Sequence, residues 1–487
     1  MKSKFFNNKL IILIVIVLIL ITFLTKYYGS TDIGDCSDVA KFFAGKYNAD
    51  IRRSHSYLFG YILSPFVKIF NSFIFFKISS LLFLFLIIYS VYILSSKDKR
   101  TLFLILLSPV IWYMAPWISS IQIASFLFLW SYYFIRKYNS TEKLKYLLYS
   151  GILIGLGWAF WDTVLYFGIF LILSFLYNKK VSHVLLILFA IFIGLIPRLI
   201  LDQLLFNFAF LTTIKTFVSG FISLFFQGIY AKSGFTTKNF LTLISIFLSI
   251  PLYFWVNYKP SLFKKNKKTI IFLTLSILLI LTNPQIRYIL IIAPIIILLL
   301  GKNLNGRSFR IQSVLSLIIL ILFISPYIIQ VKYSTGEIYG SDFTSLFGNI
   351  NKLKLEKYSF SDLILQDLEN ITQEYPNQTF LVGNQPDDYQ ILAHYYWGKD
   401  IKEFVSIQDY NLWKENETII FEKTFMPSPN IDDRRQIWLS GGISKNENDN
   451  TNYSEIKFAI GINKPIELEG AVVADKYNIL YLSKISK

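Results

Sequence analysis

The chain has 487 residues, of which 54% are apolar and 16% charged, and its mean hydropathy is +0.49. These values exclude an ordinary soluble domain, in which about 25% of residues are charged. The net charge of +17 combines +24 in residues 1–330 (32 Lys or Arg against 8 Asp or Glu) with −7 in residues 331–487 (16 against 23). Because the basic residues fall mainly in short loops between apolar runs, we expect no nucleic-acid partner.

Apolar runs close to the roughly 20 residues that cross a bilayer recur along residues 1–330. The first, at 10–24, is flanked by Lys9 and Lys26 and is followed by no cleavage pattern, which predicts an uncleaved first span. Later spans are predicted at 73–95, 101–115, 119–135, 146–162, 164–178, 182–201, 240–257, 269–282, 286–301 and 311–330. The sequence therefore predicts a polytopic α-helical membrane protein with about 11 transmembrane helices, some of them broken or tilted.

Charge alternates between the loops that join these spans. One set of loops is basic, at 97–100, 136–145, 179–180, 259–268 and 302–310. The turns near Pro116, Trp161 and Pro284 carry little charge. Because basic loops stay in the cytoplasm, this pattern predicts a multi-pass protein of the cell membrane with a cytoplasmic N-terminus. Residues 26–72, 202–238 and the tail from about 333 are then external.

The first external loop, 26–72, is predicted to contain helices that lie on the membrane surface. An apolar face at helical spacing is formed by Val39, Phe42, Phe43 and Tyr47. Lys41 and Lys46 lie off that face, and a second apolar stretch at 57–70 contains Pro65. We assign this loop to a transmembrane domain of residues 1–332. The single cysteine of the chain, Cys36, also lies here and excludes an intrachain disulfide or a Cys-based zinc cluster.

Residues 333–487 are predicted to form a small extracytoplasmic domain of the α/β or α+β class. Strands are predicted at 380–383, 418–421 and 479–482, and a helix at 387–397. Four Asn-x-Ser/Thr sequons fit an external location, at Asn370, Asn377, Asn416 and Asn452.

Three of the eight acidic residues of positions 1–330 cluster in the first external loop, at Asp32, Asp35 and Asp38. Carboxylates are costly beside hydrocarbon, so such a cluster points to a function. In a helix this spacing places them on roughly one face, where like charges raise the proton affinity of one member, as a general base requires. The same oxygens suit a divalent cation such as Mg or Mn. The simplest alternative is that they cap the following helix.

Cationic residues at the predicted outer ends of two spans are candidates for binding a lipid phosphate. Arg287 and Tyr288 lie at the mouth of the span at 286–301, and Arg suits bidentate phosphate recognition. The alternative is an interfacial Arg/Tyr anchor. Arg198 would add positive charge or simply pair with Asp202, four residues later on one helix face.

Two further residues of the predicted outer face, His55 and Asp162, can be explained without a catalytic role. His55, in the same loop as the aspartates, is a candidate to bind acceptor or phosphate, or a solvated interfacial histidine. Asp162 is interpreted as a turn residue. His183 and His394 carry no functional signal.

Taken together, these features resemble the GT-C class of membrane glycosyltransferases, which includes protein O-mannosyltransferases, aminoarabinose transferases and oligosaccharyltransferase catalytic subunits. The loop from Asp35 to Phe43, followed by His55 and Pro65, is similar to the loop of dolichyl-phosphate-mannose-dependent members. Arg287-Tyr288 with Pro294 is similar to their late Arg-Tyr-(Ile/Leu)-x-x-x-x-Pro motif. The chain lacks the adjacent Asp-Glu pair of many members, and Trp158 replaces their basic residue after Gly-Leu-Gly. The resemblance therefore leaves open which aspartate is catalytic.

The resemblance implies transfer of a sugar from a polyprenyl- or dolichyl-phosphate donor to a glycan, lipid or protein acceptor on the external face. It implies inversion at the anomeric carbon, with Asp35 as the general base and Asp38 as the second candidate. Arg287 and Arg198 would stabilise the phosphate leaving group.

Functions from other classes remain as alternatives. A membrane transporter or lipid flippase favours charges inside the spans and repeated halves, whereas Lys77 is the main interior charge here and no repeat is found. A lipid-linked polysaccharide polymerase or ligase would use a similar donor. A non-catalytic scaffold is the remaining alternative.

Overall fold

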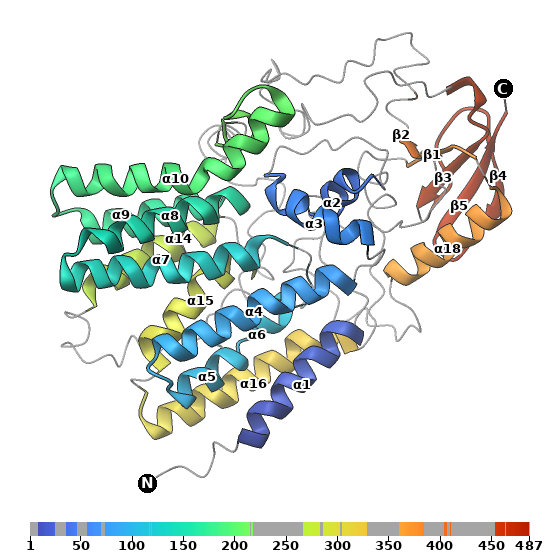
Figure 1. Cartoon of the computed structure of the whole chain (residues 1–487). Coiled ribbons are helices and arrows are strands. Elements are labelled where there is room, and N and C mark those ends of the chain that lie inside the picture. The colour runs from blue at the N-terminus through green and yellow to red at the C-terminus, as the bar shows by residue number, and fades with distance from the viewer. Residues whose placement is uncertain are drawn as a thin grey trace.

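The computed structural model describes residues 8–24, 36–45, 56–69, 74–115, 117, 119–214, 216–217, 266–282, 286–301, 304–328, 360–376, 378–383, 404–406, 410, 453–462 and 464–486. Most of these residues form helices, and a small sheet follows toward the C-terminus (Figure 1).

Helices coincide with every predicted span that the structure describes. They are α1 (Asn8–Leu24), α4 (Ile74–Leu94), α5 (Lys99–Leu106), α6 (Pro109–Met114), α7 (Ile121–Thr141), α8 (Leu144–Phe160), α9 (Val164–Leu176), α10 (Val181–Phe206), α14 (Lys267–Thr282), α15 (Ile286–Leu300) and α16 (Gly306–Ile328). The predicted span at 240–257 lies outside the described residues. Two described stretches, Phe75–Leu94 and Val181–Leu205, are long and apolar enough to cross a membrane, and several apolar helices are shorter. The number of crossings remains a prediction.

The predicted span at 101–115 is divided into two helices, α5 and α6. Ser108 is in an extended conformation between them, with φ −66° and ψ 118°, and Pro109 is the first residue of α6. Proline has no backbone N–H to continue a preceding helix, and it disfavours the helical conformation in the residue before it. The break therefore follows directly from this one residue.

Glycines bring α8 and α10 unusually close together. A Cβ atom on Gly155 would lie 2.0 Å from the Ile191 carbonyl oxygen, and one on Gly194 would lie 2.2 Å from the Ile152 carbonyl oxygen. No side chain fits at such distances, so the two backbones are in direct contact, as in small-xxx-small packing of membrane helices. This contact fixes the C-terminal end of α8 beside the second half of α10.

Two short helices of the first predicted loop, α2 (Ser37–Phe43) and α3 (Leu58–Ile69), pack against each other. Val39 of α2 fills the space above Gly60 of α3, where a Cβ atom would lie 2.5 Å from Val39 Cγ1. Val39 also belongs to an apolar cluster with Ala159 of α8 and Leu199 of α10. The opposite side of α3 is exposed and apolar, as expected of a helix that contacts lipid: Tyr61, Ile62, Phe66 and Ile69.

The described part of the C-terminal region contains helix α18 (Phe360–Glu374) and five strands: β1 (Phe380–Val382), β2 (Phe404–Ser406), β3 (Phe458–Ile462), β4 (Ala471–Lys476) and β5 (Leu480–Ile485). The strand order is β2-β1-β3-β5-β4, with β1 parallel to both neighbours and β5 antiparallel to both of its own. Leu368 and Ile371 of α18 pack on the sheet. The buried Asp367 carboxylate accepts hydrogen bonds from the backbone N–H groups of Ile479 and Leu480 and so ties α18 to the start of β5.

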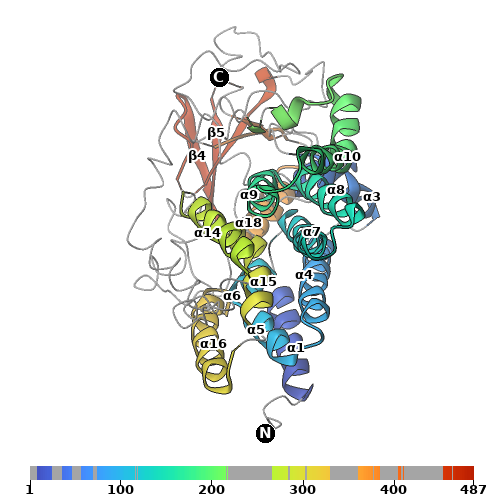
Figure 2. The ribbon, with the colours of Figure 1, turned by 90° about the vertical axis from the view of Figure 1, so that its left-hand side faces the viewer.

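The predicted strands at 380–383 and 479–482 coincide with β1 and the start of β5. The predicted helix at 387–397, the strand at 418–421 and the boundary at 333 lie outside the described residues. Figures 1 and 2 show the sheet at the end of the helices away from the N-terminus of α1, the same end at which α2 and α3 lie in Figure 1. We refer to this end as the site end.

Candidate functional site

The candidate site lies at the C-terminal end of α8. The last carbonyl groups of a helix have no partner within it, so they can accept hydrogen bonds from other segments. Each of the last three carbonyls accepts a hydrogen bond from the side chain of another segment. The pairs are Arg198 with the carbonyl of Trp158 (3.2 Å), Ser56 with Ala159 (2.5 Å) and Ser120 with Phe160 (2.8 Å). Segments that are 40 to 103 residues apart therefore meet at this helix end.

Arg198, on α10, lies at the centre of this arrangement. It is 1% exposed, and its Nη1 also forms an ion pair of 2.5 Å with Asp162 Oδ1. Its Nε donates to Thr212 Oγ1 at 2.9 Å, and its Nη2 donates to Thr216 Oγ1 at 3.4 Å. A buried cation requires such partners, because an unpaired charge in an apolar interior is strongly unfavourable. The negative end of the α8 dipole adds to the stabilisation.

Asp202 is joined to Arg198 through Thr212. The Thr212 hydroxyl accepts from Arg198 Nε and donates to Asp202, with oxygen–oxygen distances of 2.7 and 2.9 Å, and the Thr212 backbone N–H donates to Asp202 Oδ2 at 3.0 Å. The expected alternative, a simple pair of Arg198 with Asp202 on one helix face, is therefore not what is observed. The guanidinium turns instead toward the α8 carbonyl and Asp162. The ion pair thus joins α10 to the turn after α8.

Arg287, at the start of α15, lies on the same turn. Its guanidinium is 5.4 Å from the centre of the Trp161 ring and 5.5 Å from that of Tyr288. Trp161 follows α8 directly and precedes Asp162, so Arg287 is close in the fold to the Arg198 cluster. A guanidinium over aromatic faces is favoured by the ring quadrupole, the more so when water is excluded, and Arg287 is buried. The structure therefore brings three predicted residues, Arg198, Arg287 and Tyr288, to one end of the helices.

The predicted residues of the first loop are described only in part. Asp32, Asp35 and His55 lie outside the described residues. Asp38 is the second residue of α2, and its side chain is not among the described ones. Their described neighbours do reach the α8 end. Val39, which follows Asp38, packs with Ala159, and Ser56, which follows His55, donates to the Ala159 carbonyl. That the aspartates of the first loop face Arg198 and Arg287 remains a prediction.

No protein-family model matches the chain, and no curated protein is similar to it in sequence. Solved structures do match it. The fold is similar to that of ArnT. Two crystal structures of ArnT from Cupriavidus metallidurans, one in the apo state and one bound to undecaprenyl phosphate, align with 98% of this chain and 98% of ArnT. Each has a TM-score of 0.60 at 12% identity. The expected mostly helical fold is thereby supported at the level of architecture.

Within this ArnT-like fold, two lysines near the site end are buried, Lys41 on α2 and Lys77 on α4. The Lys77 ammonium donates to the Thr22 carbonyl near the end of α1 at 2.9 Å. Lys41 was predicted to lie off the apolar face of this helix, and the structure buries its side chain as well. The reason is that α2 does not rest on a membrane surface alone: α3 and the ends of α8 and α10 cover it, so several of its faces are buried.

Among the residues that the structure describes, no group of three His, Cys, Asp or Glu side chains lies close enough to hold a metal ion. The predicted ligands Asp32 and Asp35 are not in that set. A cation held by the aspartate cluster therefore remains a prediction.

Sequence reasoning did not single out the partners of the candidate site: Asp162, Ser56, Ser120 and Thr212. Asp162 lies in the turn after α8, as interpreted, and it is also the ion-pair partner of Arg198. Its scarcity was the available signal, because it is one of only eight acids in positions 1–330. Hydroxyl residues carry no comparable signal, since they are common and their partners here are carbonyls or side chains far away in sequence.

Proposed function

We propose that this protein is a membrane glycosyltransferase that transfers a sugar from a polyprenyl-phosphate donor to an acceptor on the external face of the membrane. The observation that carries the proposal is the ArnT-like fold over almost the whole chain, since ArnT holds undecaprenyl phosphate in one of its crystal structures. The arrangement of charges supports it. Arg198 and Arg287 are gathered at the end of the helices where the first loop packs, as a phosphate leaving group requires.

In the proposed reaction, Asp35 removes the proton from an acceptor hydroxyl, with Asp38 as the second candidate. The resulting oxygen attacks the anomeric carbon from the face opposite the phosphate. The new glycosidic bond forms as the bond from the anomeric carbon to the phosphate oxygen breaks, which inverts the configuration. The products are the glycosylated acceptor and polyprenyl phosphate, and the proton remains on the aspartate until it is released to water.

The cations have different proposed roles. Arg287 and Tyr288 contact the donor phosphate, with the guanidinium held over Trp161 so that it is in place before the charge develops. Arg198 is engaged by Asp162, Thr212 and the Trp158 carbonyl. It therefore adds positive potential from behind and fixes the α8 end. His55 binds the acceptor or the phosphate from the first loop.

Sugar transfer in isolated membranes tests the proposal. Membranes that contain the full-length protein are incubated with radiolabelled polyprenyl-phosphate sugars, mannose first, and transfer to acceptor and release of polyprenyl phosphate are measured. Asp35→Asn is expected to lower transfer by about 10²- to 10⁴-fold, the range of a general base. Asp50→Asn, in the same predicted loop, is the matched control and retains activity.

Each result leads to a definite conclusion. Full transfer by the double variant of Asp35→Asn and Asp38→Asn would exclude the aspartate base. Loss of transfer with chelator, and recovery with Mg or Mn, would favour a cation held by the aspartate cluster instead. No transfer from any lipid-linked sugar by the unmodified protein would contradict the glycosyltransferase proposal itself.

A further inference from the structure

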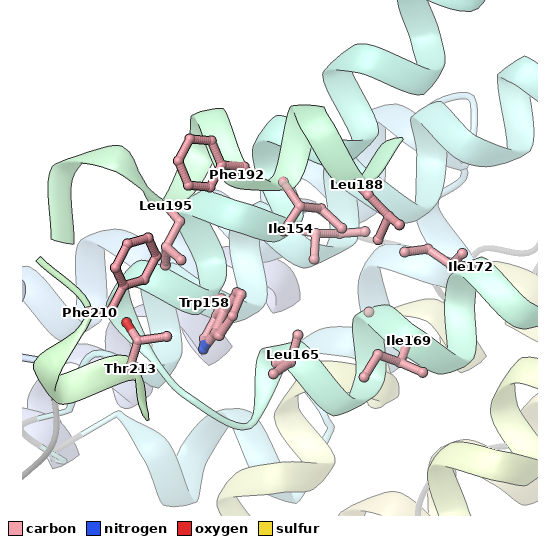
Figure 3. A pocket seen from close by; sticks show the side chains of 12 residues that line it. Ile154, Trp158, Leu165, Ile169, Ile172, Leu188, Phe192, Leu195, Phe210 and Thr213 are labelled. Atoms are coloured by element: carbon pink, nitrogen blue, oxygen red, sulfur yellow. The ribbon is translucent and has the colours of Figure 1, made fainter. Parts of the chain in front are cut away.

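The end of the helices opposite the site end carries a second set of charges. Because α8 finishes at the site end, α7 ends and α8 begins at this opposite end, and α9 ends and α10 begins there too (Figure 1). An apolar stretch separates the two ends. Figure 3 shows part of it, a cavity of about 270 Å³ between α8, α9 and α10, with Trp158 and Thr213 near one end and Leu188 and Ile172 near the other. The second set of charges begins at Phe175, one turn beyond Ile172 on α9.

Lys268, in the first turn of α14, lies at the centre of this second set. Its ammonium donates to Asn139 Oδ1 at 2.7 Å and to the carbonyl of Phe175 at 2.9 Å, so it joins the ends of α7 and α9. The side chain is half-buried. Burial lowers the pKa of Lys268, and the charge of Lys179 lowers it further. Two ammonium groups are therefore held near each other at one helix end, despite their mutual repulsion.

Further cations surround this pair of lysines. We refer to five residues as the basic cluster: Arg136, Lys179, Lys180, Lys267 and Lys268. Arg136 of α7 donates to Asn266 Oδ1 at 3.4 Å, directly before the start of α14. Of the three acids in the described stretches 119–214 and 266–282, two belong to the site end. The third, Glu142, pairs with Lys179 at 2.5 Å. The cluster therefore keeps an excess of positive charge that the described acids do not balance.

The starts of two helices add to this excess. The first N–H groups of a helix carry partial positive charge, which Asp, Asn, Ser or Thr usually offsets. The residue before α10 is Lys180, no side chain caps this helix start, and its first turn has no acid. α14 begins with Lys267 and Lys268, again without an acid in the first turn. An anion from outside the chain is favoured among such helix ends.

The depth of the basic cluster identifies that anion as a lipid phosphate. From Lys180 to Arg198 along α10 the rise is about 27 Å at 1.5 Å per residue. The hydrocarbon core of a bilayer is about 30 Å thick. With the site end at one membrane surface, the basic cluster therefore lies at the head groups of the other leaflet. Tyr177 and Val181, which flank Lys179 and Lys180, are 58% and 73% exposed and offer an apolar surface beside these cations.

We propose that the basic cluster binds the head group of an anionic phospholipid in the leaflet opposite the site end, which is the cytoplasmic leaflet in the predicted topology. The phosphate lies among Lys179, Lys180 and Lys268, and the acyl chains pack beside Tyr177 and Val181. Basic pockets between transmembrane helices on the cytoplasmic side bind such head groups in other proteins. The bound lipid holds the ends of α7 and α9 against the starts of α10 and α14. The proposal concerns the leaflet opposite the proposed sugar transfer and does not rest on it.

Lipid binding to the purified full-length protein tests the proposal. Native mass spectrometry in detergent counts the lipids that stay bound when phosphatidylglycerol or phosphatidylcholine with the same acyl chains is added. Phosphatidylglycerol is expected to bind more tightly, and to slow amide hydrogen exchange in peptides that contain Asn139, Lys179 and Lys268. Equal binding of the two lipids, or slower exchange at the site end alone, would overturn the proposal. Displacement of phosphatidylglycerol by inorganic phosphate would also overturn it, because the ligand would then be a soluble anion.

Charge-removal variants with a matched control locate the binding. Lys179→Gln combined with Lys180→Gln is expected to weaken phosphatidylglycerol binding about 30-fold, at about 1 kcal/mol for each cation near an anionic surface. Lys143→Gln combined with Lys145→Gln removes the same charge from exposed positions at the start of α8, where Lys145 lies over the Tyr146 ring and outside the basic cluster. This control should bind phosphatidylglycerol normally. Equal weakening in the two double variants would show unspecific attraction to a basic surface and reject the site.

A second pair of substitutions, Arg136→Gln combined with Lys267→Gln, keeps the test decisive if one variant folds poorly. It removes cations from the α7 and α14 side of the basic cluster and is expected to weaken binding to a similar extent. Unchanged binding in both cluster variants would refute the site. The result is separate from that for the proposed function, because phosphatidylglycerol binding at this end neither requires nor predicts sugar transfer at the site end.

Discussion

The two ends of α8 hold charge in opposite ways. At the site end, Arg198 of α10 and Asp162 of the turn after α8 form an ion pair whose side chains are 1% and 12% exposed. At the other end, Glu142 follows α7, and its ion pair with Lys179 is exposed, at 72% and 21%. The Lys179 hydrogen bond holds the pKa of Glu142 below its usual value, yet water surrounds the pair. An ion pair is therefore buried at one end of α8 and exposed to solvent at the other.

The difference lies in what each arrangement costs. An exposed pair is worth little, at about 0 to 1 kcal/mol, and salt screens it. Lys179 belongs to one of the basic loops that are predicted to stay in the cytoplasm. A buried pair is expensive to assemble and strongly destabilising to break. The buried charges at the site end therefore either hold the α8 end in place or bind a charged ligand. Substitutions distinguish these two roles.

The largest effect is expected for Arg198→Met. The change breaks the ion pair with Asp162 and the hydrogen bond to Thr212, and breaking a buried pair costs about 3 to 5 kcal/mol. The thermal midpoint in detergent, followed by size-exclusion chromatography, should fall steeply. Lys179→Met, at the exposed pair, is the control and should change it little.

The double variant of Arg198→Met and Asp162→Met sharpens the comparison. Because it also removes the Asp162 carboxylate, which loses its ion pair in the single variant, it should recover part of the lost stability. A thermal midpoint that is equally unaffected by Arg198→Met and by Lys179→Met would show that the buried cluster does not hold the fold.

Arg287→Gln is expected to act on catalysis more than on stability. Loss of a cation that stabilises the leaving phosphate should lower transfer by about 10²- to 10³-fold, or roughly 2.7 to 4 kcal/mol in the barrier. The lost contact with Trp161 and Tyr288 costs less, about 0.5 to 2 kcal/mol in folding. Rates of sugar transfer and thermal midpoints are measured on the same preparations.

The control for Arg287 is Arg307→Gln, in the first turn of α16 and exposed. It should leave both quantities unchanged. Arg287→Lys keeps the charge but loses the planar fork, so it should recover only part of the rate. Normal transfer by Arg287→Gln would remove this residue from the proposed site.

How far the sequence predicts this molecule depends on the range of the interaction. The helices could be predicted from apolar runs, and even the break before Pro109 has a local cause. Arg287, Tyr288 and Arg198 could be singled out because a charge or an Arg-Tyr pair beside an apolar span is locally visible. Their assembly around Trp161 and Asp162 could not, because it depends on how helices far apart in sequence cross.

Two features of the structure could not be predicted from the sequence. The burial of Lys41 was not predicted, because periodicity identifies one apolar face of a helix but not a second element that covers another face. The cavity between α9 and α10 depends on the close approach of α8 and α10 at Gly155 and Gly194, which leaves α9 apart. Isolated glycines in an apolar run show neither which helix approaches nor what space remains.

The smallest expected effect, for Ser56→Ala, tests whether the first loop is tied to the site end. The Ser56 hydroxyl donates to the Ala159 carbonyl across 103 residues, whereas the Ser64 hydroxyl on α3 donates to Tyr61, three residues away. Ser56→Ala should cost about 1 kcal/mol, since it leaves a buried carbonyl without its partner. It should also increase amide hydrogen exchange in peptides of α2 and α3. Ser64→Ala removes a hydroxyl that bonds within α3 and does not release the loop, so exchange should stay unchanged. If both variants exchange alike, the aspartates of that loop are not held to the α8 end through Ser56, and the packing of Val39 on Ala159 must position them alone.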